Sequence, residues 1–186
     1  MSEFDYFAIV VAIPLGLALV EIAQGVSVTL RRHRDVAVGL LTPLLAVVLL
    51  TLLIDAWLQL WAAQQSVEIN RLYLTMGLFA ASVFYVAASF IFPDQIEAGA
   101  DLDDWFMQYR KYSLGGTFLL VFALRLAQGY GIPQLDQDSI VGTAAYLVGW
   151  GLRPGLILVA IFAKRRWIIV SALSALIVMP IFVAMS

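Results

Sequence analysis

The fold of this chain is constrained most by three long runs without a charged residue. Val36–Ile54, Leu72–Pro93 and Trp167–Met185 contain 19, 22 and 19 uncharged residues. A helix of about 20 apolar residues spans the roughly 30 Å hydrocarbon core of a bilayer. Hydrophobic residues make up 62% of the chain and charged residues 13%, more apolar surface than a soluble core of this length buries. The sequence therefore predicts a polytopic membrane protein.

Three further apolar stretches reach this length only if each includes a charged residue. They are Phe4–Leu30 with Asp5 at its edge and Glu21 inside, Tyr112–Gly131 with Arg125, and Ser139–Ala163 with Arg153. The stretch that starts at Val36 also continues past Asp55 to about Ala63. We therefore predict an all-α bundle in one domain, residues 1–186, with transmembrane helices at about 6–30, 36–63, 72–93, 112–130, 139–163 and 166–185.

A separate amphipathic helix is predicted at residues 101–112, in the longest connection. Apolar side chains recur there at helical spacing, and Asp101 is placed to cap the first turn. An aromatic helix of this kind lies in the membrane interface, on the cytoplasmic side. Two interpretations stay open, a connector resting on lipid headgroups or a docking surface for a partner. The apolar residues are Leu102, Trp105, Phe106, Tyr109 and Tyr112.

Basic residues gather in alternate connections of this six-helix arrangement. Because lysine and arginine are enriched in cytoplasmic loops, we predict cytoplasmic basic loops and both termini outside. The three basic connections hold Arg31, Arg32 and Arg34; Arg110 and Lys111; and Lys164, Arg165 and Arg166, which are 8 of the 11 basic residues.

Composition excludes several classes of function. Apolar composition and a net charge of −2 argue against a soluble enzyme and against a nucleic-acid partner. The chain has no cysteine and one histidine, which excludes disulfides, thiolate chemistry, iron–sulfur clusters and bis-histidine haem. No motif for a metal or cofactor is present, so we expect neither.

Four charged residues, Glu21, Asp55, Arg125 and Arg153, fall inside predicted membrane helices. A charge at a helix centre costs roughly 2.5–3.5 kcal/mol, so each requires a partner or water. Depths estimated at about 1.5 Å per residue place Glu21 level with Arg153 near the midplane. The same estimate places Asp55 and Arg125 in the outer half. Depth therefore predicts two ion pairs, Glu21–Arg153 and Asp55–Arg125.

Polar side chains accompany these charges on the same helix faces. Their function is left open between a polar pathway or binding pocket and hydrogen bonds that hold the helices together. The supporting residues are Gln24, Thr51, Gln59, Ser82, Tyr85 and Gln128.

A bend or break is predicted in the fifth helix, where Pro154 follows Arg153. Proline removes a backbone donor and its ring clashes with the preceding turn, and nearby glycines weaken the helix further. Transporters place binding sites at such breaks. The alternative is a kinked helix packed closely against a neighbour. The glycines are Gly149, Gly151 and Gly155.

Two short motifs carry a resemblance that spans most of the chain. Phe4-Asp5-Tyr6 and Phe92-Pro93-Asp94, with the six-helix layout, resemble a set of small uncharacterised bacterial inner-membrane proteins. The resemblance implies a bacterial origin and says nothing about activity. We accordingly predict a location in the bacterial inner membrane.

Two functions are consistent with these patterns. The first is a channel or transporter for an ion or small solute, acting as a homo-oligomer in the lipid bilayer, with the four membrane charges along its pathway. The second is a non-catalytic accessory or scaffold subunit of a larger membrane complex. An intramembrane enzyme acting on lipid is disfavoured, because no nucleophile or metal site accompanies Glu21 and Asp55.

Overall fold

The computed structural model describes residues 3–63, 71–93, 99–127 and 140–185, and describes side chains for 4–61, 71–93, 99–124 and 151–179. Apart from one isolated β-bridge, regular structure in these residues is helical. The described helices are α1 (Glu3–Arg31), α2 (Leu41–Ala63), α3 (Arg71–Ser89), α4 (Leu102–Ala127), α5 (Ile140–Phe162) and α6 (Arg166–Met185). The all-α prediction is therefore confirmed.

Three helices have the length and apolar composition to cross a membrane. Within the described residues they provide the stretches Phe4–Arg31, Leu41–Trp61 and Arg71–Ser89. Shorter apolar stretches lie in the last two helices, at Gly151–Phe162 and Arg166–Met179. The first turns of α4 carry charged residues, which make that helix less apolar. The chain thus has the features of a membrane protein with at least these three candidate spans.

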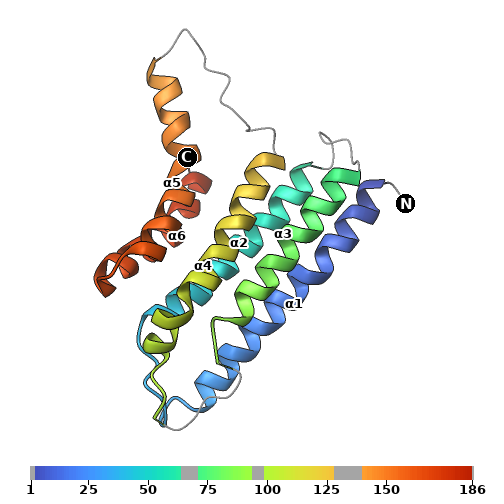
Figure 1. Ribbon diagram of the computed structural model, residues 1–186. Coiled ribbons are helices and arrows are strands. Elements are labelled where there is room, and N and C mark those ends of the chain that lie inside the picture. The colour runs from blue at the N-terminus through green and yellow to red at the C-terminus, as the bar shows by residue number, and fades with distance from the viewer. Residues whose placement is uncertain (1–2, 64–70, 94–98, 128–139, 186) are drawn as a thin grey trace.

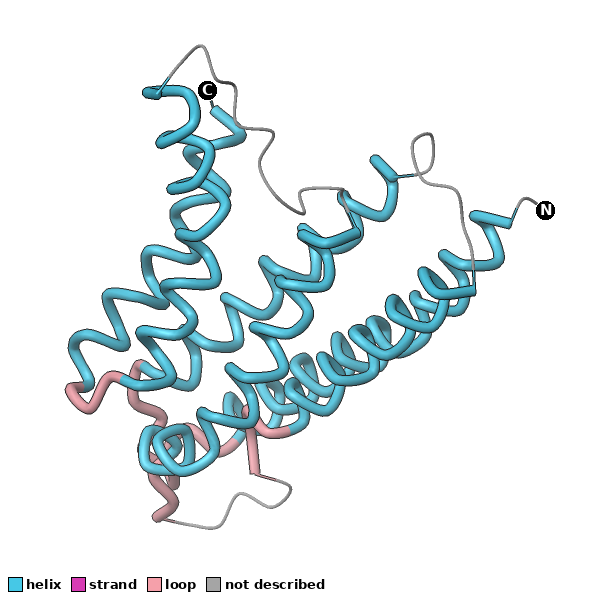
Figure 2. The backbone as a smooth tube through the Cα atoms, turned by 45° about the horizontal axis from the view of Figure 1, so that its top comes forward, coloured by secondary structure: helices cyan, strands magenta, loops and turns pink. Residues whose placement is uncertain are grey.

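The first four helices lie side by side, and α5 and α6 form a hairpin at one side of them (Figure 1). Helix α1 packs against α2 and α3, at the side away from the hairpin. Helix α4 packs against α3, α2 and α5, while α6 packs against α2 and α5. A second view shows the same hairpin beside the other helices (Figure 2). The hairpin therefore reaches the rest of the molecule through α2 and α4.

Small residues bring α3 and α4 close together. A Cβ built on Gly116 would lie 2.5 Å from the Ala87 Cβ and 3.0 Å from the Val83 carbonyl oxygen. Small side chains of this kind allow helices to approach closely where lipid replaces water around them. The buried alanines on α3 are Ala80, Ala81, Ala87 and Ala88.

The predicted interfacial helix at 101–112 is wrong as a separate element. These residues form the first turns of α4, which continues without interruption to Ala127. The capping prediction is confirmed, because Asp101 Oδ1 accepts hydrogen bonds from the backbone N–H of Asp103 at 2.8 Å and of Asp104 at 3.3 Å.

Aromatic packing explains why the first turns of α4 stay with the bundle. The Trp105 indole donates to the Phe90 carbonyl at 3.2 Å, and Phe106 is 2% exposed. Phe90 stacks on Tyr109, with ring centroids 5.9 Å apart. Trp105, Tyr109 and Tyr112 thus contact Phe90, directly after α3.

Of the predicted bend or break in α5, the break does not occur, and the bend stays a prediction. Residues 149–155, with Pro154 among them, remain helical within α5. Packing after Pro154 favours the continuous helix, since Ile157 and Ala160 are fully buried. The alternative of close packing at Gly151 and Gly155 is not observed either, because a Cβ at these positions meets nothing within 4 Å.

Helix α2 begins at Leu41, later than the predicted residue 36, because residues 36–40 are not helical and contact the start of α4. Ala37 forms a parallel bridge with Asp101. The Ala37 N–H donates to the Ala100 carbonyl at 3.0 Å, and the Leu102 N–H donates to the Ala37 carbonyl at 3.0 Å. Gly39 then turns the chain with a φ of +62°, in the left-handed region that favours glycine. The connection before α2 is thereby joined to the start of α4.

The Asp103 carboxylate caps α2 from a different helix. Oδ1 accepts from the Leu41 N–H at 2.9 Å and Oδ2 from the Leu40 N–H at 3.4 Å. The Thr42 hydroxyl donates to the Leu102 carbonyl at 2.8 Å. A carboxylate satisfies the free N–H groups at a helix start and interacts favourably with the positive end of the helix dipole.

Candidate functional site

An ion pair joins α2 to α5 within the apolar part of the bundle. Arg153 Nη1 lies 2.7 Å from Asp55 Oδ2. The Arg153 side chain is 14% exposed and the Asp55 side chain 17% exposed. Both charges are therefore largely removed from the surroundings of the protein, and each supplies the partner that the other requires.

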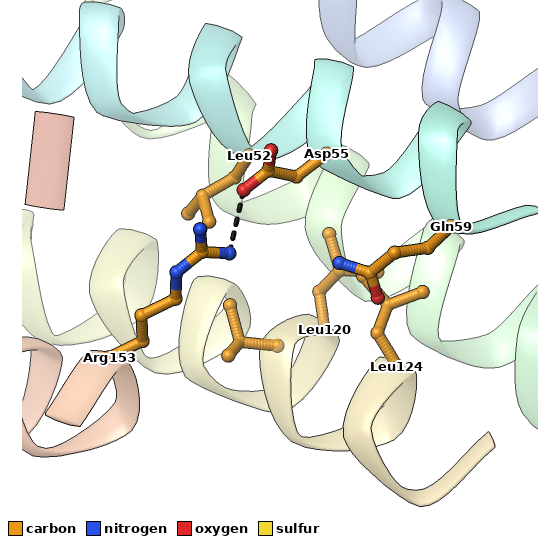
Figure 3. Close-up of a pocket in the computed structure, with 7 residues that line it drawn as sticks. Leu52, Asp55, Gln59, Leu120, Leu124 and Arg153 are labelled. Atoms are coloured by element: carbon orange, nitrogen blue, oxygen red, sulfur yellow. Dashed lines mark hydrogen bonds and ion pairs between the residues drawn. The ribbon is translucent and has the colours of Figure 1, made fainter. Parts of the chain in front are cut away.

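A small cavity adjoins this ion pair. Its volume is about 10 Å³, measured as the space that the centre of a water molecule can occupy, and this is close to the minimum for one water. In Figure 3, Asp55, Gln59 and Arg153 surround the space with leucine side chains. The lining residues are Leu52, Asp55 and Gln59 from α2, Leu120, Val121 and Leu124 from α4, and Arg153 from α5.

Gln59 contributes a free acceptor to the cavity. Its Oε1 atom is buried and accepts no hydrogen bond from the described residues. A buried amide oxygen without a donor costs about 1–3 kcal/mol. A water in such a site needs two to four polar partners, and Asp55, Gln59 and Arg153 are the polar residues that line this cavity. The site can thus hold a water or a small polar group beside the ion pair.

The walls of the cavity strengthen the electrostatics of the pair. Leu52, Leu120, Val121 and Leu124 carry no dipole that screens the charges. Coulomb attraction grows as the effective dielectric falls, so the pair is stronger here than at an aqueous surface. The same environment penalises either charge heavily when its partner is lost.

The predicted partner of Arg153 is wrong. Arg153 binds Asp55, not Glu21, and α1 does not pack against α5 among the described residues. Depth places residues at one level but does not determine which helices are neighbours. The Arg125 side chain lies outside the described ones, so the Asp55–Arg125 pair stays a prediction. The Asp55 oxygen Oδ2 is bonded to Arg153.

Most of the predicted supporting residues lie away from the cavity. Thr51 and Ser82 donate to the carbonyls of Val47 and Leu78, four residues earlier in their own helices. Tyr85 packs against the hydrophobic core. Gln128 lies outside the described residues. Among the supporting residues with described side chains, Gln59 alone lines the cavity, while Glu21 and Gln24 lie on α1.

Two further polar contacts tie the hairpin to α4. Arg110 donates to the Ala163 carbonyl at the end of α5, and Arg166 lies 2.7 Å from the Asp104 carboxylate. Burial lowers the pKa of the Arg110 guanidinium from its ordinary value. In the sequence, Arg110 and Arg166 indicate only the orientation of the helices in the membrane. Nothing in the local sequence indicates that Arg110 reaches a carbonyl 53 residues away.

Clusters of three potential metal ligands are absent from the described residues. No protein-family model matches the chain, and no match was found among curated proteins or among solved structures. The polar site between α2, α4 and α5 therefore carries the functional argument.

Proposed function

We propose that this chain is an integral protein of the bacterial inner membrane with six spans, cytoplasmic basic loops and both termini outside. Contacts between the connections support this arrangement. The Gly99 N–H donates to the Asp35 carbonyl at 2.7 Å, and Asp104 pairs with Arg166. The three basic connections therefore lie at one end of the bundle, as cytoplasmic loops would.

We further propose that the protein is a channel or transporter for an ion or small solute. The observation that carries this proposal is the partly buried Asp55–Arg153 pair beside the unsatisfied Gln59 amide oxygen. Charged residues within membrane helices almost always face the interior of the bundle, and they commonly mark pathways for ions and solutes. In the proposed transport mechanism, the site between α2, α4 and α5 is closed while Asp55 and Arg153 form their ion pair.

Opening requires a replacement partner for each charge. When α5 moves away from α2, Asp55 and Arg153 lose each other and must bind water or cargo, since neither is stable alone in an apolar site. A cation takes the place of Arg153 at Asp55, and an anionic group takes the place of Asp55 at Arg153. The hairpin of α5 and α6 is the element that moves, because its main contacts with the other described helices are those with α2 and α4.

The small size of the cavity favours a second candidate function. Space for about one water is far below that for a hydrated ion or a solute. A closed ion pair in so small a space also suits a bundle that is held together structurally. An accessory or scaffold subunit of a larger membrane complex is therefore the alternative.

Flux through proteoliposomes distinguishes the two candidates. We expect the purified chain to carry at least one of H⁺, Na⁺, K⁺ or Cl⁻ faster than empty liposomes, measured with entrapped indicators. Asp55→Asn is expected to change that rate roughly tenfold, the factor equivalent to 1.4 kcal/mol. Thr75→Val is the matched control, because the Thr75 hydroxyl donates to its own helix at Arg71. Absence of flux for all four ions under every gradient would contradict ion transport and favour the accessory subunit.

A further inference from the structure

Helix α1 forms one edge of the bundle and has an outward face that contacts no other described helix (Figure 1). Along this face the exposed residues are apolar for the first five turns, as a surface in contact with lipid requires. They are Ile9, Ile13, Leu17 and Val20, which are 47–61% exposed.

Two polar residues interrupt this apolar face. Gln24 follows Val20 by one turn and is exposed, and Glu21 beside it is partly exposed. Glu21 lies ten residues before Arg31, ~15 Å along the helix, and Gln24 lies seven residues before it, ~10 Å along the helix. If Arg31 marks the basic membrane surface, both side chains fall within the hydrocarbon region.

Neither side chain has a partner among the residues that the structure describes. Glu21 and Gln24 make no hydrogen bond or ion pair to any described residue. Ser27, one turn closer to the surface, does have one, because its hydroxyl accepts from Arg31 at 2.9 Å. Lipid tails offer no donor or acceptor, so polar side chains at this depth are strongly driven to associate with another helix.

We propose that a second copy of this chain covers this face of α1. The two residues are complementary to themselves across a twofold axis along the membrane normal, because Glu21 offers carboxylate acceptors and Gln24 offers amide donors. In such a parallel pair the Gln24 amide of each copy donates to the Glu21 carboxylate of the other. One surface patch then serves both copies, as a twofold interface requires.

A glycine on the same face permits the approach. Gly16 lies one turn before Val20, and a Cβ built there meets nothing within 4 Å. Small residues at a helix surface allow two membrane helices to come close enough for side-chain hydrogen bonds. The proposed dimer does not depend on transport, and it leaves the cavity at Asp55 and Arg153 on the other side of α2.

Cysteine cross-linking tests the dimer directly, because the chain contains no cysteine. Val20→Cys is placed on the proposed interface, and Val178→Cys on α6 is the control with 45% exposure. After oxidation in native membranes, we expect Val20→Cys to form a product of twice the chain mass, roughly tenfold more than the control. Two interhelical hydrogen bonds give a factor of about this size.

A second variant separates the polar contacts from simple proximity. Adding Glu21→Leu and Gln24→Leu to Val20→Cys is expected to reduce the dimer product roughly tenfold. Circular dichroism of the purified variants checks that the helical content is retained. Equal cross-linking in Val20→Cys and the control, or no decrease in the leucine variant, would overturn the proposal. A product containing a different protein would also overturn it, because that partner would occupy the face.

Discussion

Replacement of Asp55 by leucine is expected to lower the free energy of unfolding by about 3–5 kcal/mol. Arg153 would then remain charged in a site walled by Leu52, Leu120 and Leu124. A guanidinium group cannot lose its proton under these conditions, so the unpaired charge persists. The measurement is denaturant unfolding of the purified protein in detergent micelles, followed by circular dichroism.

Replacement of Arg153 by leucine should lower the free energy of unfolding by less than replacement of Asp55. In Arg153→Leu the Asp55 carboxyl group can take up a proton and become neutral, which removes the buried charge. The double variant with leucine at both positions should recover most of the stability lost in Asp55→Leu, since no buried charge remains. If the two single changes and the double change are simply additive, the two residues are not coupled, and the ion pair contributes nothing to the fold.

Replacement of Gly39 by alanine is expected to lower the free energy of unfolding by about 2–4 kcal/mol. The φ of +62° alone costs about 1–2 kcal/mol for a residue with a Cβ. The added Cβ would also overlap the Asp103 carboxylate that caps α2. Loss of a capping contact typically costs about 1 kcal/mol more. Thermal unfolding in the same micelles measures the change.

Gly99 provides the matched control for this substitution. Its φ of +83° is also left-handed, but a Cβ there meets nothing within 4 Å. Gly99→Ala should therefore show only the backbone cost of about 1–2 kcal/mol. An equal loss for both glycines would show that the Asp103 cap adds nothing, and that the junction depends on backbone conformation alone.

The helices themselves could be predicted well from the sequence, because apolar length is a local property. The runs around Leu49 and Phe84 led directly to α2 and α3, and both residues are fully buried. Boundaries were less accurate where backbone contacts from elsewhere intervene. The start of α2 is moved to Leu41 by an extended segment that pairs with residues more than 60 positions away.

The partners of the charged residues could not be predicted from the sequence. Composition correctly indicated that Asp55 and Arg153 require partners, but their pairing depends on which helices touch, and depth carries no such information. The cavity is lined by Leu120, Val121 and Leu124, which have no feature that separates them from other apolar residues of α4. The aromatic residues around Trp105 were misplaced for the same reason, because an amphipathic helix can rest on lipid or on protein.

The proposed six-span arrangement would place the ion pair and the α1 face within the bilayer, so the membrane topology of the chain is the most direct test. Single cysteines at His33, Lys164 and Arg71, all exposed, can be labelled with a membrane-impermeant maleimide in intact cells and in inverted vesicles. We expect His33→Cys and Lys164→Cys to react only from the cytoplasmic side and Arg71→Cys only from the outside. Reaction of His33→Cys and Lys164→Cys from opposite sides, or of Arg71→Cys from the cytoplasm, would contradict the six-span arrangement.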